Sequence, residues 1–138
     1  MTQQSMSLGA RAIAALFLYW AGAAMAQSGT ATPPLKRTEI VRGDVSVPNR
    51  EAIVAHIEIA AGATAPRHTH PGDEISYFLG GEGELLIDGQ PPRRLKAGEA
   101  FIIPAGIVHA ARNPGAEPAR LVGVYILEKG QPLATPAK

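Results

Sequence analysis

Cysteine is absent from this 138-residue chain, and aromatic side chains are scarce. Without cysteine the protein has no disulfide, no thiol nucleophile, no thiolate ligand for a metal and no lipid anchor attached through a cysteine. Aromatic residues make up 5% of the chain, a thin supply for stacking a large flat ligand. The fold must therefore be held by apolar burial, by a metal ion or by self-association.

The chain also lacks an excess of charge of either sign, with 13 Lys and Arg against 12 Asp and Glu. No basic stripe is present. Arg93, Arg94 and Lys96 form a small cluster beside a turn, which is typical of a solvent-exposed edge strand. We therefore expect no nucleic-acid partner.

The longest apolar run lies at the N-terminus. Residues 1–26 carry one charge, Arg11, followed by apolar residues 12–24 and the small-residue ending A-M-A. This pattern is typical of a cleavable signal peptide, and the run is shorter than the roughly 20 residues that span a bilayer. We predict cleavage after Ala26, a periplasmic or secreted mature protein, and no stable membrane anchor after cleavage; an uncleaved N-terminal anchor is the alternative.

The rest of the chain has the period-two pattern of β-strands. Apolar residues occupy every second position from Ile53 to Ile59, as in a half-buried strand. Further strands are expected at 38–47, 68–70, 75–79, 84–88, 93–96, 101–103, 108–112 and 120–127, separated by glycine and proline turn signals. This predicts an all-β sandwich or barrel over 38–128, with a flexible lead-in at 27–37 and a flexible tail at 129–138.

Two segments that each begin at a glycine contain three of the four histidines. They read Gly62-x5-His68-x-His70-x3-Glu74-x6-Gly81 and Gly98-x5-Pro104-x-Gly106-x2-His109-x3-Asn113. Alternate residues of a strand face the same side, so His68 and His70 can direct both imidazoles at one point, and Glu74 has the same parity. A tight turn before His109 would bring that histidine in from a separate strand. The four motif glycines are expected to have positive φ or close backbone neighbours.

Three imidazoles and one carboxylate, with no sulfur, suit one divalent transition metal ion: iron, manganese, nickel, copper, cobalt or zinc. A single negative ligand leaves such a site formally positive. It should therefore attract an anionic or enolisable oxygen ligand. In the alternative, an empty site, the histidines would only pack the barrel.

Both segments match the two signature motifs of the cupin superfamily at every fixed position, and the resemblance covers residues 38–127. It implies a small jelly-roll β-barrel, a single-domain (type 2) cupin, with His68, His70, Glu74 and His109 as metal ligands. Members of the superfamily include non-haem dioxygenases, isomerases, decarboxylases and ligand-binding domains, so the resemblance implies the fold more closely than the reaction. The chain has little sequence for a lid.

Three functions follow as hypotheses. The first is a metal-dependent enzyme, dioxygenase-like or isomerase-like, that acts on a small oxygen-rich substrate, with Glu74 as a ligand or, if displaced, as a base. The second is a non-catalytic module that binds a small-molecule ligand through the metal. The third is a barrel in which the ion only adds stability. We also expect a homodimer, because a small barrel of this kind usually buries one face against a partner.

Several further residues could line a pocket beside the predicted site. We expect Phe78, Phe101, Ile103 and Tyr125 to belong mainly to the core, and Tyr77 to point away from the metal because its parity is opposite to that of Glu74. His56 and Arg67 are expected at the surface, although Arg67 could meet an anionic substrate. Asn113 and Gly81 are expected to serve turns.

Overall fold

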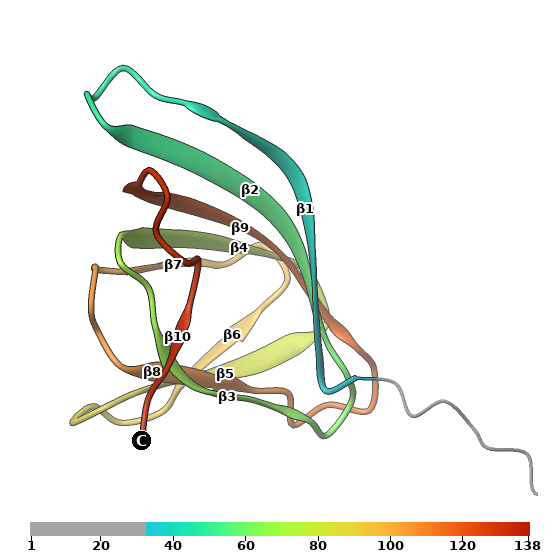
Figure 1. Ribbon diagram of the computed structural model, residues 1–138. Coiled ribbons are helices and arrows are strands. Elements are labelled where there is room, and N and C mark those ends of the chain that lie inside the picture. Colours follow the sequence, from blue (N-terminus) through green and yellow to red (C-terminus); the bar gives the residue numbers. More distant parts are fainter. Residues whose placement is uncertain (1–32) are drawn as a thin grey trace, which may run out of the picture. The chain divides into compact units, whose positions relative to one another are not determined.

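The computed structural model describes residues 33–138, in which all regular structure is β-strand (Figure 1). The strands are β1 (Leu35–Asp44), β2 (Arg50–Ile59), β3 (Thr64–Thr69), β4 (Asp73–Gly80), β5 (Glu82–Ile87), β6 (Arg93–Lys96), β7 (Ala100–Ile103), β8 (His109–Arg112), β9 (Ala119–Glu128) and β10 (Thr135–Pro136). Within this described part, no helix is long and apolar enough to cross a membrane. The predicted signal peptide, residues 1–26, lies outside the described residues.

The strands form two five-stranded antiparallel sheets that face each other (Figure 1). The first has the order β1-β2-β9-β4-β7, and the second β10-β3-β8-β5-β6. Side chains alternate between buried and half-buried along the whole of β2, so the period in the sequence does separate a core face from an outer face. The predicted all-β jelly-roll barrel is confirmed.

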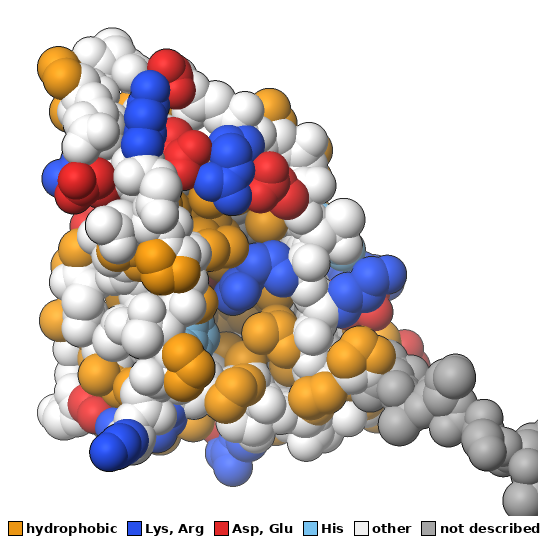
Figure 2. Space-filling model, viewed as in Figure 1, with side chains coloured by type: hydrophobic (Ala, Val, Ile, Leu, Met, Phe, Trp, Pro, Cys, Tyr) orange, Lys and Arg blue, Asp and Glu red, His pale blue; other side chains and the backbone are white. Residues whose placement is uncertain are grey.

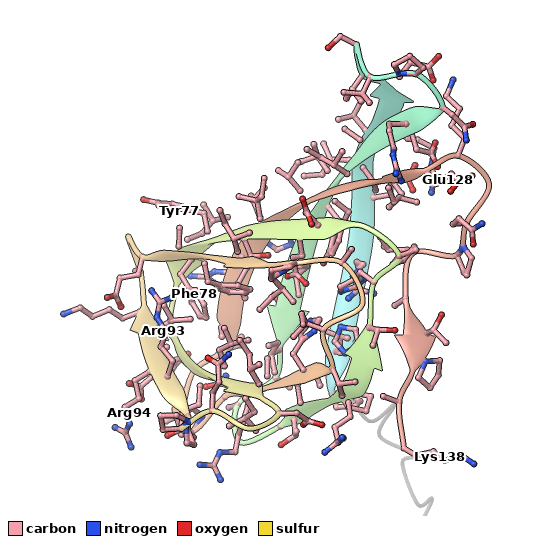
Figure 3. The ribbon with its side chains drawn as sticks, turned by 90° about the vertical axis from the view of Figure 1, so that its left-hand side faces the viewer. Tyr77, Phe78, Arg93, Arg94, Glu128 and Lys138 are labelled. Atoms are coloured by element: carbon pink, nitrogen blue, oxygen red, sulfur yellow. The ribbon has the colours of Figure 1, made fainter. Side chains whose placement is uncertain are left out.

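The barrel core lies between the two sheets. It is built from the apolar side chains of the inner faces, with Phe78, Phe101, Ile103 and Tyr125 among its buried members. Tyr77 and Phe78 are neighbours on β4 whose side chains point to opposite faces of the sheet. Figure 3 shows Tyr77 on the outer side of the strand and Phe78 on the inner side. Their exposed fractions are 48% and 3%. The parity prediction for Tyr77 is therefore confirmed.

The motif turns have the expected backbone conformations. All four motif glycines have positive φ. At Gly106, with φ of 77°, the backbone N–H donates to the carbonyl of His70 at 2.8 Å, so the turn before His109 is tied directly to the first histidine segment. The side chain of Asn113 is fully buried and donates to the carbonyls of Ile59, Ala60 and Glu117. Its Oδ1 accepts from the N–H of Gly115 at 2.9 Å, which confirms its expected place in a turn.

The C-terminal segment differs from the sequence prediction. We expected a flexible tail over 129–138, whereas Thr135 and Pro136 pair with Thr69 and His68 as strand β10. The N–H of Ala137 also donates to the carbonyl of Arg67 at 3.0 Å. A two-residue strand is too short to show a period in the sequence, so only its pairing partner reveals it. β1 likewise begins at Leu35, within the expected lead-in.

The outer face of the first sheet is unusually apolar. One row of cross-strand neighbours runs over all five strands and consists of Val41, Val54, Val124, Ile75 and Ile102. Ile75 is 38% exposed and Ile102 is 64% exposed. We call this row the apolar outer row.

Candidate metal centre

The structure brings His68, His70, Glu74 and His109 together at the inner surface of the barrel. One ligand atom from each residue lies within 4.8 Å of all the others. His68 on β3 and His109 on β8 are paired in register, and His70 follows directly after the end of β3. Three of the four side chains are buried, and His68 is half-buried.

Glu74 reaches this cluster by a different route from the one that parity suggested. It lies on β4, which belongs to the first sheet, whereas the three histidines belong to the second sheet or to the loop that follows β3. The bend at Pro71 and Gly72 carries the chain from one sheet to the other, and no side chain fits at Gly72, where an added Cβ would lie 1.9 Å from the carbonyl oxygen of Ile126. The cluster therefore bridges the two sheets.

Each histidine presents the same ring nitrogen to the centre of the cluster. The Nδ1 atoms of His68, His70 and His109 lie 2.7, 2.5 and 2.9 Å from the backbone carbonyl oxygens of Pro66, Leu133 and Ile107. A carbonyl can only accept, so each Nδ1 carries the proton. In the neutral imidazoles the Nε2 lone pairs then face one another, which is the arrangement in which histidine ligates a metal.

Three separations between neighbouring donor atoms are those expected around a single ion. Nε2 of His68 is 3.2 Å from Nε2 of His70, and Oε2 of Glu74 is 3.0 Å from Nε2 of His70 and 3.3 Å from Nε2 of His109. Neighbouring ligands that each lie about 2.1 Å from one ion are about 3.0 to 3.4 Å apart. Two facing imidazole lone pairs repel each other unless a cation or a proton lies between them, so the donor set fits a divalent transition metal.

Glu74 is held as a carboxylate. Burial by itself raises its pKa, but the hydrogen bond from Ser76 and the contacts with Nε2 of His109 and of His70, which become hydrogen bonds when a proton lies there, outweigh burial and hold the pKa well below its usual range. The Ser76 hydroxyl donates to Oε1 at 2.6 Å and is itself fully buried. Oε2 is thereby left for the histidines. Sequence reasoning missed Ser76, although it has the same parity as Glu74 on the strand.

The pKa values of His68 and His109, the two histidines that pair in register, are shifted in opposite directions. Burial lowers the pKa of His68, and the neighbouring charges of His109, His70 and Arg37 lower it further. Burial also lowers the pKa of His109, but its hydrogen bonds to Glu74 and to the Ile107 carbonyl outweigh burial and raise it. In the absence of a cation, a proton shared by His109 and Glu74 is thus the favoured occupant of the cluster.

Two residues that we did not assign to the site adjoin the ligands. Tyr125, expected in the core, is the cross-strand neighbour of Glu74, and its ring lies 4.8 Å from that of His70. Arg37, expected in the flexible lead-in, lies on β1 with its guanidinium 5.6 Å from the Tyr125 ring centre. Arg37 lies in one cross-strand row with the core residues Ile57 and Leu121. The sequence could have indicated this inward direction, because Leu35 and Arg37 have the same parity on one strand.

The remaining candidates lie away from the ligands. Arg67 is half-exposed and forms an ion pair with Asp88 at 2.6 Å. His56 lies on the outer side of β2 opposite Val122. Arg93, Arg94 and Lys96 belong to β6, the edge strand of the second sheet.

Two cavities meet at the cluster. The inner cavity, about 40 Å³, is lined by Arg37, His68, Glu74, His109, Tyr125 and apolar core residues. The outer cavity, about 200 Å³, is lined by Leu35, Arg37, Pro66, Arg67, His68, Ala134 and Pro136. Both cavities share Leu35, Arg37 and His68, so these residues separate the ligand cluster from the surface.

The sequence of the chain is similar to parts of several known proteins. The chain is 45% identical over 57 residues to the dimethylsulfoniopropionate lyase DddQ of Ruegeria pomeroyi, a match that covers 41% of this chain and 28% of that protein. It is 35% identical over 77 residues to a germin-like protein of Arabidopsis thaliana, subfamily 2 member 2, covering 52% of this chain and 35% of that protein. The chain thus spans only about a third of the length of these curated relatives.

Solved structures agree with the fold. A cupin-like protein of Thermotoga maritima superimposes with a TM-score of 0.62 at 26% identity and covers 75% of both chains. The crystal structure of the lyase DddQ superimposes with a TM-score of 0.57 at 30% identity, covering 62% of this chain and 43% of that one. The family model described as a cupin domain matches residues 55–135. Since that match spans more than half of the chain and includes all four clustered residues, the protein belongs to the cupin family.

Proposed function

We propose that the protein is a mononuclear metal-dependent enzyme that acts on a small, oxygen-rich anion. The observation that carries the proposal is the buried cluster of His68, His70, Glu74 and His109, whose Nε2 and carboxylate donors face one point beside a cavity. A divalent ion held there supplies a Lewis acid for a substrate oxygen. The ion with one carboxylate ligand leaves a formally positive site, which favours an anionic substrate.

Side chains around the cluster have separate roles in this proposal. The low pKa of Glu74 and its bond from Ser76 favour a ligand over a proton acceptor. Burial raises the pKa of Tyr125, and the nearby charge of Glu74 raises it further, so the hydroxyl stays protonated and can donate to a substrate oxygen. The apolar lining of the inner cavity excludes bulk water and strengthens these polar contacts.

The similarity to a dimethylsulfoniopropionate lyase favours lyase chemistry on a small carboxylate. Isomerase-like and dioxygenase-like reactions use the same kind of site and belong to the same proposal. The first substrates to assay are therefore dimethylsulfoniopropionate and other short carboxylates, with product formation and dioxygen consumption followed in parallel.

The test begins with elemental analysis of the purified protein and of its His70→Ala variant. We expect about one equivalent of iron, manganese, nickel, copper, cobalt or zinc in the wild-type protein and a large loss in the variant. Absence of metal from both proteins would reject the metal-dependent enzyme.

A non-catalytic binding module is the second candidate, because the inner cavity of about 40 Å³ admits only a few atoms. Glu74→Gln separates the two functions, since turnover should collapse in an enzyme whereas a binding module would lose only affinity. Glu58→Gln, on the outer face of β2, is the matched control and should leave both properties unchanged.

We also propose a homodimer formed through the apolar outer row. Apolar side chains in register on all five strands of one sheet form a self-complementary surface that a two-fold contact would bury. Light scattering should give twice the monomer mass for the wild-type protein and the monomer mass for Ile75→Lys, with Thr64→Lys on the second sheet as control. A wild-type monomer would reject this assembly.

We also propose that the protein is exported to the periplasm or the medium. Export is supported by the arrangement of Arg11, the apolar residues 12–24 and the A-M-A ending. Cell fractionation with N-terminal sequencing should find a mature protein that begins at Gln27 outside the cytoplasm. A cytoplasmic protein that retains its N-terminus would contradict export.

A further inference from the structure

Arg37 carries a charge that the described part of the protein does not neutralise. Its Nε atom is buried and has no hydrogen-bond partner among the described residues. None of the ion pairs formed within residues 33–138 includes Arg37, whereas Arg67 beside it is paired with Asp88. Burying an unpaired guanidinium costs free energy, and this cost falls when a ligand of opposite charge pairs with it.

The Tyr125 hydroxyl is a second buried polar group that lacks a close hydrogen-bond partner. This side chain is 1% exposed, and its hydroxyl has no hydrogen-bond partner within 3.5 Å in the described structure. Burial and the charge of Glu74 raise its pKa, and the neighbouring Arg37 lowers the pKa by less. The hydroxyl occupies space over Gly123, where an added Cβ would lie 2.9 Å from it. Glycine at this position therefore leaves room for the hydroxyl on the inner face of β9, beside Glu74.

Both unsatisfied groups line the cavity that contains the metal ligands. Arg37 and Tyr125 lie beside Glu74, His68 and His109 in the inner cavity, and Arg37 also lines the outer one. Figure 2 shows a Lys or Arg side chain in a hollow of this face, bordered by hydrophobic side chains and close to a histidine. Because Arg37 lines both cavities, a ligand that passes from the outer cavity to the inner one passes its guanidinium.

We propose that Arg37 and Tyr125 form a carboxylate-binding subsite that orients the substrate of the metal centre. A carboxylate offers two acceptor oxygens, which match the fork of a guanidinium, with the phenol as a further donor. The remaining end of the substrate then faces the four clustered residues. The inner and outer cavities are smaller than the roughly 300 Å³ at which drug-sized sites begin, so the substrate class is a short monocarboxylate that carries a second oxygen-containing or leaving group.

This inference rests on the proposed function but is tested separately from it. The measurement is calorimetric titration of the metal-loaded protein with acetate and with the uncharged isostere acetamide. Arg37→Gln should weaken acetate binding about tenfold, the loss expected for a hydrogen bond to a charged group, and leave acetamide binding within about twofold. Tyr125→Phe should weaken acetate binding by a smaller factor.

Arg67→Gln is the matched control, because it removes an arginine of the outer cavity that already has a carboxylate partner. It should leave acetate binding unchanged. Elemental analysis should find the same metal content in every variant. If Arg37→Gln does not fold, Arg37→Lys, which keeps the charge but loses the fork, should still weaken acetate binding relative to the wild-type protein.

Three results would overturn the subsite: no acetate binding by the wild-type protein at about 0.1 M, equal acetate binding by wild type and Arg37→Gln, or loss of metal from the Arg37 variant. The last would mean that Arg37 serves the ligands and not the substrate. A failure to find turnover would reject the enzyme while leaving the dependence of acetate binding on Arg37 intact, so the two failures are distinguishable.

Discussion

At the level of single residues, hydrogen bonds fix the orientation of each side chain in the candidate metal centre. Three carbonyls hold the Nδ1 protons of His68, His70 and His109, and Ser76 holds one oxygen of Glu74. Partners of this kind set the orientation and basicity of the ligands. Their removal should therefore affect metal binding more than folding.

Ser76→Ala tests this directly. The variant removes the bond to Oε1 of Glu74 with little change in volume, and we expect metal affinity to fall about tenfold or more while the free energy of unfolding drops by only about 1 kcal/mol. Competition with a fluorescent chelator measures the affinity, and urea unfolding measures the stability. Thr64→Ala, an exposed change on β3, is the control; equal affinity in Ser76→Ala and wild type would contradict the role of Ser76.

The pKa of His109 predicts how the metal-free protein responds to pH. Because folding raises this pKa above the ordinary 6.5, the stabilisation is complete below pH 6.5 and is lost as pH rises through the folded-state value. His68, whose pKa is lowered from the same ordinary value, destabilises only below pH 6.5 and does not oppose this trend. The melting temperature of metal-free protein should therefore fall as pH rises from about 6.5 to 8.

Metal-loaded protein should not show this fall, because the ion replaces the proton between Glu74 and His109. Thermal unfolding at several pH values, with and without chelator, makes the comparison. The Glu74→Gln protein should lose the pH dependence in its metal-free form. A metal-free melting temperature that is flat or rising between pH 6.5 and 8 would contradict the assigned proton.

At the scale of elements, the C-terminal strand supports the first histidine segment. β10 pairs with Thr69 and His68, and the carbonyl of Leu133 accepts the Nδ1 proton of His70. The same segment contributes Ala134 and Pro136 to the outer cavity. A segment without a visible period in the sequence thus belongs to the site.

Removal of residues 131–138 should weaken metal binding about tenfold or more, since His70 loses the acceptor that fixes its ring. The barrel should still fold, because the core cluster lies almost wholly in β2 to β9. Chelator competition and circular dichroism provide the two readouts. Removal of Lys138 alone is the control, and unchanged metal affinity in the longer truncation would show that β10 does not support the site.

At the scale of the whole molecule, the cluster joins the two sheets. Glu74 comes from the first sheet, and His68 and His109 come from the second. An ion held by residues of both sheets would stabilise the native barrel and not the unfolded chain. Binding therefore adds to the free energy of unfolding by mass action.

Chelation should lower the melting temperature by about 10 °C or more, since an ion present at 100 times its dissociation constant adds about 2.7 kcal/mol and each kcal/mol shifts a domain of this size by about 4 to 8 °C. Differential scanning calorimetry with EDTA, and then with excess metal restored, measures the effect. His56→Ala, on the outer face, should leave the shift unchanged. A melting temperature insensitive to EDTA in protein that is shown to contain metal would argue against a cross-sheet ion.

Local patterns in the sequence predict most of the strands and the four clustered residues. Period-two alternation identified β2, the Asp-Gly turn identified the hairpin of β5 and β6, and the spacing of the histidines identified the cluster. These features are local, because the direction of a side chain along one strand follows from its parity alone.

Which distant groups meet this cluster depends on the order and register of the strands in the two sheets. Glu74 reaches the histidines from the opposite sheet, and Arg37 on β1 meets Tyr125 on β9. The carbonyl of Leu133 orients His70 from 63 positions away. Strand order and register between non-consecutive strands fix such contacts, and neither leaves a periodic trace in the residues concerned. The sequence alone therefore identifies the four residues that could hold a metal ion, whereas the residues that would bind a substrate come together only in the folded barrel.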